Sequence, residues 1–321
     1  MKAALTGHSI RPKGRAAGYL ASLTASLAAG LELLPGTFRS RHSEYLLAAQ
    51  RPDGGFAGRQ GGSDVYYTMF ALRSAELLVP ADEGLWRRAA QYASSLSAPP
   101  RDMIECFCLL YIRRLVAERA GIERSDEGYS EIMEALGRSR AADGGYARFP
   151  GGEATLYHTF LAALCAELSE LNFPGAKEAA AFVESRRCAG GGYAESGKDG
   201  DGATNSTAAA TALLSLSAVM PPRDAAVEFL ASMQRPEGGF AACAGASEPD
   251  LLSTFTAAVA LAGIGALGRV KLAPIARFAH ALQAPGGGFR GCVADAAPDV
   301  EYTYYGLGTL ALLAQAAGRG T

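Results

Sequence analysis

The sequence predicts an all-α protein built from six repeats of about 47 residues, each repeat a pair of helices. Two recurring anchors support this prediction, and long alternating runs that would indicate strands are absent. The first anchor is a glycine pair followed by an aromatic residue. Its second glycines, at positions 55, 145, 192, 239 and 288, lie 90, 47, 47 and 49 residues apart. The first gap therefore spans two repeats, and one repeat lacks its glycines.

The second anchor is a threonine that follows each second glycine by 13 to 15 residues, at Thr68, Thr159, Thr207, Thr254 and Thr303. The repeat without glycines begins near Arg101, where Cys106 takes the place of the threonine. This assignment completes the set of six repeats.

Residues 1–35 precede the repeats, and we expect them to form an N-terminal helical extension. The apolar run from Ala16 to Leu34 is interrupted by Ser22, Thr24 and Glu32, so it is too polar for a membrane span. Residues 36–321 are then predicted to form the repeat domain.

Within a repeat, the glycine turn leads into a helix that is apolar nearly all round, which is typical of an inner helix covered on both sides. Aspartates stand where these inner helices begin, as expected of N-caps, at Asp64, Asp102, Asp250 and Asp299. An amphipathic, charged helix follows, for which an outer position is expected, at residues 82–96, 176–187, 223–234 and 272–283. These patterns allow either a closed ring or an open solenoid.

The charge and the cysteine content limit the classes of function that the sequence allows. The formal net charge is −2, and charges of both signs are mixed along the chain. This balance predicts neither a nucleic-acid partner nor an anionic membrane surface. The six cysteines form no C-x-x-C pair, and we expect free thiols in a reducing, cytoplasmic environment.

Three of the glycine turns, QRPDGGF, MQRPEGGF and LQAPGGGF, resemble the Q-x-x-x-G-G-[FW] repeat of protein prenyltransferase β subunits and squalene/oxidosqualene cyclases. The resemblance extends from about residue 41 to residue 313. It implies an α/α toroid, with six inner and six outer helices around a central cavity. It also implies an isoprenoid ligand, either a prenyl diphosphate or a terpenoid.

In the family, residues at the start of the inner helices face the cavity. The positions in this chain that match, together with two aromatic residues one turn deeper, are Tyr66, Tyr67, Glu105, Tyr157, His158, Asn205, Phe255, Tyr302 and Tyr305. Aromatic walls offer apolar area and π faces, which suit an isoprenoid chain and its cationic intermediates. The alternative is that these aromatic side chains only pack helix against helix.

The resemblance to prenyltransferases also implies a zinc site, but two of its three ligands are replaced. Asp250 matches the aspartate, Leu252 stands where the family has cysteine, and Tyr302 stands where it has histidine. The loop 241–250 has no basic residue to hold a diphosphate. Of the three zinc ligands that the resemblance implies, Asp250 is the one present, and an N-cap role also accounts for it.

The cyclases supply a second template, because hopene cyclases place a D-x-D-D-T motif at the start of an inner helix. The sequence Asp299-Val300-Glu301-Tyr302-Thr303 is similar to it. The resemblance implies that Glu301 donates a proton as general acid, with Asp299 beside it. A salt bridge at the rim, or a contact with the dipole of the helix, is the alternative role for Glu301.

Three interpretations remain open. The first is a prenyltransferase-like protein that binds an isoprenoid, and the second is a class II-type terpenoid cyclase; both are enzymes by resemblance. The third is a non-catalytic toroid that binds a protein or peptide. Because prenyltransferase β subunits pair with a helical-repeat α subunit, a similar partner chain is a further expectation.

Overall fold

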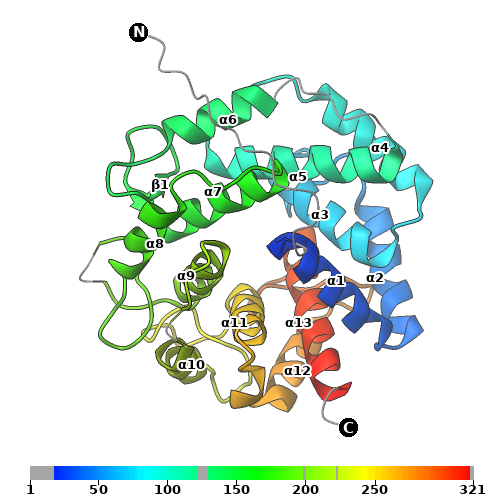
Figure 1. Cartoon of the computed structure of the whole chain (residues 1–321). Coiled ribbons are helices and arrows are strands. Elements are labelled where there is room, and N and C mark those ends of the chain that lie inside the picture. The colour runs from blue at the N-terminus through cyan, green and yellow to red at the C-terminus, as the bar shows by residue number, and fades with distance from the viewer. Residues whose placement is uncertain (1–17, 122–128, 198–199, 222, 319–321) are drawn as a thin grey trace.

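A computed structural model describes residues 18–121, 129–197, 200–221 and 223–318. Within them an inner ring of helices comprises α3 (Val65–Leu78), α5 (Met103–Ala120), α7 (Leu156–Leu168), α9 (Thr204–Leu216), α11 (Leu251–Gly263) and α13 (Val300–Gly318). An outer ring comprises α2 (Gly36–Ala49), α4 (Glu83–Ser95), α6 (Tyr129–Arg138), α8 (Ala176–Glu184), α10 (Arg223–Ser232) and α12 (Leu272–Ala281). Figure 1 shows the two rings. The fold is therefore an α/α toroid.

The remaining elements are short or precede the rings. A hairpin of β1 (Tyr146–Ala147) and β2 (Ala154–Thr155) lies between α6 and α7, and a 3₁₀ turn, η1, covers Leu267–Arg269. Helix α1 (Tyr19–Glu32) precedes the rings. No helix in the described part of the chain combines the length and apolar character needed to cross a membrane.

The threonine and glycine anchors of the repeat are joined by one recurring hydrogen bond. The backbone N–H of the aromatic residue after the glycines donates to the threonine hydroxyl, as from Phe240 to Thr254 at 2.9 Å. The same bond recurs in the other four glycine-bearing repeats. Each of these threonines is fully buried. The spacing in the sequence thus fixes how each turn docks on its inner helix.

The sixth repeat packs against the first outer helix and closes the ring. A side chain at Gly287, whose φ is 95°, would place its Cβ 2.5 Å from the carbonyl oxygen of Arg41 on α2. The N–H of Gly288 donates to Nδ1 of His42 at 3.0 Å, and the His42 ring stacks on Phe289. On the inside, α13 packs against both α11 and α3. The chain is therefore closed rather than an open solenoid.

The predicted aspartate caps are confirmed, because each carboxylate accepts a backbone N–H from the first turn of its helix. The outer helices end somewhat earlier than predicted. Helix α8 ends at Glu184 rather than at residue 187, because Arg187 already pairs with Tyr193 in an isolated bridge.

Helix α1 lies against the ends of the inner helices that are opposite their N-caps. A carboxylate near the end of α7, Glu167, accepts the N–H groups of Tyr19 and Leu20 at 2.9 and 2.8 Å. Farther along, Ser26 bonds Gln315 near the end of α13. Figure 1 shows α1 in front of α13. Residues 1–17 of the expected N-terminal extension lie outside the described residues.

Candidate functional site

A cavity of about 810 Å³ lies inside the inner ring. Its wall is mainly apolar, with Phe70, Phe107, Phe160 and Phe255 among the lining residues. It extends from exposed Arg101, beside the N-cap of α5, to Tyr19, Leu20 and Leu23 of α1 at the opposite end. Ligand sites of this size range are typical of proteins that enclose small molecules.

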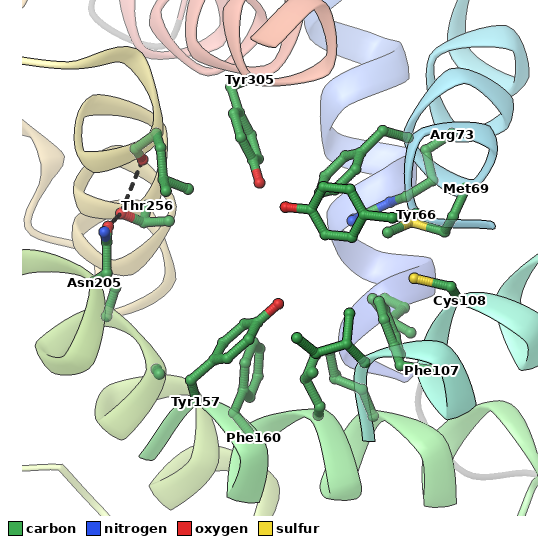
Figure 2. Close-up of a pocket in the computed structure, with 18 of the residues that line it drawn as sticks. Tyr66, Met69, Arg73, Phe107, Cys108, Tyr157, Phe160, Asn205, Thr256 and Tyr305 are labelled. Atoms are coloured by element: carbon green, nitrogen blue, oxygen red, sulfur yellow. Dashed lines mark hydrogen bonds between the residues drawn. The ribbon is translucent and has the colours of Figure 1, made fainter. Parts of the chain in front are cut away.

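Three tyrosine hydroxyls point into the central space from different inner helices. They belong to Tyr66, Tyr157 and Tyr305 (Figure 2). On a further wall, the hydroxyl of Thr256 donates to Oδ1 of Asn205 at 2.6 Å. The cavity is therefore apolar with a small set of polar groups, an arrangement that can orient a largely hydrocarbon ligand.

The side chains that face the cavity occupy a repeating position, two residues after the N-cap of each inner helix. Lining residues at this position are Tyr66, Ile104, Tyr157, Asn205 and Leu252. In the sixth repeat the position belongs to Glu301, which is not itself a lining residue. Of the predicted lining residues, the structure places Tyr66, Glu105, Tyr157, Asn205, Phe255 and Tyr305 on the cavity wall.

Three other predicted lining residues, Tyr67, His158 and Tyr302, lie outside this wall. Each stands three residues after an N-cap, one position beyond the repeating one, and one residue turns an α-helix by about 100°. Glu105 has the same position on α5 and still lines the cavity. The ring of Tyr302 lies under the guanidinium of Arg59 rather than in the cavity. His158 Nδ1 lies 2.8 Å from the hydroxyl of Thr155, and burial lowers the pKa of this histidine.

Glu301 adjoins the cavity through two of the tyrosines. The hydroxyl of Tyr66 donates to Oε1 of Glu301 at 2.6 Å, and that of Tyr305 reaches the same oxygen at 3.3 Å. Burial raises the pKa of Glu301 above that of an ordinary glutamate, while these two hydrogen bonds act in the opposite direction. The carboxyl group can thus retain its proton to a higher pH than an exposed glutamate.

The carboxylate of Asp299 is engaged by its own helix and by an arginine. Its Oδ1 accepts the N–H of Tyr302 at 2.9 Å, and Oδ2 lies 3.1 Å from Nε of Arg59. Arg59 also forms two hydrogen bonds with Asp295. Burial raises the pKa of Asp299, and the N–H of Tyr302 and the charge of Arg59 oppose that rise. Asp299 is therefore a helix cap and an ion-pair partner close to Glu301.

The residues around Asp250 do not fit a zinc site. Oδ1 of Asp250 accepts the N–H of Ser253 at 2.7 Å, and Oδ2 accepts its hydroxyl at 2.8 Å. Leu252 lines the cavity with a side chain that has no donor atom. The described residues contain no group of three or more His, Cys, Asp or Glu side chains placed to hold a metal ion. We therefore derive no chemistry through zinc.

Sequence reasoning missed several charged residues of the cavity wall, including Arg148, Glu195 and, on the inner helix α3, Arg73. Arg73 follows Tyr66 by seven residues on α3, a spacing that returns a helix to the same face. That spacing was a signal available in the sequence. The contribution of α1 to the wall had no such signal, since it depends on how that helix docks.

A family model, the prenyltransferase alpha-alpha toroid domain, matches residues 28–88, 83–200 and 207–319. The chain belongs to this family. No curated protein sequence matches it. Among solved structures, protein geranylgeranyltransferase-I of Candida albicans, complexed with GGPP, is similar with a TM-score of 0.61 and 17% identity, covering 90% of this chain and 91% of that chain.

Two further solved structures share the toroid. The type II terpene cyclase MstE from Scytonema, in complex with its product merosterolic acid A, has a TM-score of 0.59 and 13% identity, covering 94% of this chain and 99% of that chain. An alpha-1,6-mannanase of Salegentibacter has a TM-score of 0.59 and 10% identity, covering 90% and 99%. At these identities the likeness shows the fold, and the site must decide the function.

Proposed function

We propose that this toroid binds an isoprenoid in its central cavity. The observation that carries the proposal is the apolar, aromatic wall of a cavity of about 810 Å³. Each Å² of hydrocarbon surface removed from water contributes roughly 25 cal/mol. The similar geranylgeranyltransferase and terpene cyclase, whose structures hold GGPP and merosterolic acid A, support the same ligand class.

Calorimetric titration with geranylgeraniol and with squalene tests this proposal. We expect saturable binding with one site per chain and a raised unfolding temperature, since a ligand of the native state stabilises it. Ala209 lines the cavity, so Ala209→Phe should weaken binding by occupying that space. Ala48→Phe, at an exposed site on the outer helix α2, is the matched control. Absence of binding by both compounds would refute the proposal.

A second function, class II-type cyclisation, is favoured by the contact of Glu301 with Tyr66 and Tyr305. In this proposal the carboxylic acid of Glu301 protonates a terminal alkene. The alkene π electrons form the new C–H bond, and a carbocation remains on the neighbouring carbon. The faces of Phe70 and Phe255, both on the cavity wall, would stabilise that charge. Glu301 is left as a carboxylate until it regains a proton.

Two further functions receive less support: zinc-dependent alkylation of a thiol, which the resemblance to prenyltransferases implies, and the binding of a protein or peptide alone. Zinc-dependent thiol alkylation lacks ligands, because Leu252 and Tyr302 replace two of the three. A toroid that binds only a protein or peptide would have no need of an aromatic interior, whereas this chain keeps a large cavity inside its ring. A helical-repeat partner subunit remains a proposal, and a pull-down from the native host would test it.

A further inference from the structure

Arg73 brings a positive charge deep into the apolar cavity. The residue lines the cavity and is only 9% exposed. It follows Tyr66 by seven residues on α3, which places it about 10 Å farther along the helix axis, away from the rim. In Figure 2 its guanidinium is seen behind the ring of Tyr66.

In the part of the chain that the structure describes, Arg73 has no carboxylate within ion-pair distance, and the charge of Glu76 acts on it only from farther away. Its Nη2 donates to the hydroxyl of Tyr304 at 2.5 Å, and its guanidinium carbon lies 4.1 Å from the ring centroid of Tyr304 and 5.1 Å from that of Tyr111. Nε is buried without any hydrogen-bond partner. Among the described residues no carboxylate forms an ion pair with Arg73, and Glu76 is bonded to Arg119 instead.

A buried cation held by aromatic faces and the neutral hydroxyls of Tyr304 and Tyr111 is costly to the folded state. Packing alone does not require it, because a methionine would fill a similar volume without charge. Nε itself is covered by other protein atoms, so a ligand would reach the guanidinium through the small part of Arg73 that stays exposed at the cavity wall. A ligand that brings an anion to this end of the cavity would balance the charge of Arg73.

We propose that Arg73 binds the carboxylate of an isoprenoid carboxylic acid, whose hydrocarbon tail extends along the aromatic wall toward Glu301. This inference rests on the proposed function. One guanidinium balances one negative charge, whereas a diphosphate would leave excess buried charge. The other cations of the wall, Arg101 and Arg148, lie near the rim and bond Glu105 and Asp102.

This orientation also fits the charge of any cationic intermediate. A guanidinium would repel a carbocation formed close to it, so the reactive end of the ligand belongs at the other end of the cavity. Tyr66, which bonds Glu301 from the first turn of α3, is at that end. The ligand carboxylate, by neutralising Arg73, also weakens the repulsion between Arg73 and a carbocation on the hydrocarbon chain of the ligand.

The test measures the affinities of four compounds of one chain length: geranylgeranoic acid, its methyl ester, geranylgeraniol and geranylgeranyl diphosphate. At pH 7.5 we expect the wild-type protein to prefer the acid over the ester by on the order of 10- to 100-fold. In Arg73→Met this preference should fall to within about threefold, while the ester binds as before. Arg73→Lys, which keeps the charge but not the fork of donors, should retain part of it.

Each contrary outcome identifies what failed. Equal affinity of the wild-type protein for acid and ester would overturn the inference and leave the proposed function standing. A failure of all four compounds to bind would overturn the proposed function itself. Tighter binding of the diphosphate than of the acid would exclude a carboxylate as the head group. Loss of the preference in Arg148→Met but not in Arg73→Met would place the anion at the rim and refute the role of Arg73.

The comparison in the wild-type protein decides the matter even if Arg73→Met does not fold. Tyr304→Phe then supplies the second variant, because it removes the hydroxyl that holds Nη2 and keeps the ring under the guanidinium. We expect a smaller acid preference in Tyr304→Phe than in wild type. An unchanged preference would mean that Arg73 does not position the head group.

Discussion

The hydroxyl of Tyr66 lies 2.6 Å from Oε1 of Glu301, although 235 residues separate them in the sequence. Tyr66 belongs to α3 of the first repeat and Glu301 to α13 of the last. The contact exists because the ring closes and brings these two helices together. It also ties the buried acid to the wall of the cavity, so closure of the fold and assembly of the candidate site are one event.

Glu301→Gln tests the proposed general acid. The amide keeps the shape of the side chain but cannot protonate an alkene. We expect formation of cyclic products from linear isoprenoids to fall by at least about 100-fold, with ligand affinity retained. The measurement is product analysis by mass spectrometry after incubation with squalene, oxidosqualene and prenyl diphosphates.

The control for Glu301→Gln is Glu44→Gln, at an exposed position on the outer helix α2. It should leave product formation as in wild type. Turnover by Glu301→Gln at the wild-type rate would remove this residue from the mechanism and leave isoprenoid binding as the proposed function.

Tyr66→Phe should raise the pKa of Glu301 further. Burial already raises that pKa, and the hydrogen bond from Tyr66, which lowers it, is lost in the variant. The stabilisation that comes with a raised carboxyl pKa is fully present below the pKa of the unfolded state and is lost as pH rises through the folded pKa. In Tyr66→Phe this loss should move to higher pH.

Urea unfolding between pH 4 and 8 measures this shift without any substrate. Tyr305→Phe should move the curve less, because its hydroxyl lies farther from Glu301, at 3.3 Å. Superimposable pH curves for wild type and Tyr66→Phe would show that the hydrogen bond does not tune this carboxyl group.

The six helix pairs could be predicted from sequence because their determinants are local and repeated, whereas the closed ring was implied only by the resemblance to prenyltransferase and cyclase repeats. The glycine turns, the aspartate caps and threonines such as Thr254 each act within one repeat. The residues that line the cavity were harder to predict from sequence. Tyr66 and Tyr67 both stand in a first turn, and only the helical phase relative to the cap separates the residue that faces inward from its neighbour. Counting from the caps would have separated Tyr66 from Tyr67, but it would also have excluded Glu105, which lines the cavity three residues after its cap.

Other parts of the site depend on packing between distant segments. Arg73 shares the helical face of Tyr66, but nothing local says that its Nε has no partner. The cavity-lining residues of α1 depend on its docking to Glu167, 148 residues away from Tyr19. No pattern within α1 itself encodes that contact.

Gly287→Ala should open the closure between the sixth repeat and α2. A Cβ at this position would lie 2.5 Å from the carbonyl oxygen of Arg41, at a φ of 95°. Gly61 has a similar φ of 86° but no atom within 4 Å of its Cβ. Gly61→Ala should cost about 1–2 kcal/mol from backbone strain alone, and Gly287→Ala distinctly more. Equal costs in denaturant unfolding would show that the clash is relieved without loss.

Thr254→Val tests the hydrogen bond that joins the two anchors of a repeat. The variant keeps the shape but leaves the buried N–H of Phe240 without an acceptor. A loss of about 1–3 kcal/mol in the free energy of unfolding is expected. Thr254→Ser retains the hydroxyl and should recover most of it, apart from the cost of the missing methyl group. A Ser variant as unstable as the Val variant would assign the effect to packing.

Glu167→Gln should loosen α1 from the end of the cavity that it covers. The carboxylate of Glu167 accepts the N–H groups of Tyr19 and Leu20, and its negative charge lies at the positive end of the α1 dipole. An amide oxygen can replace one of these acceptors but not the charge. We expect faster amide hydrogen exchange confined to α1. The free energy of opening this helix should fall by about 1 kcal/mol. Because Leu20 and Leu23 line the cavity, isoprenoid affinity should fall with it. Faster exchange spread evenly over all inner helices would instead show that Glu167 supports the whole ring, and α1 would then have no separate role at the cavity.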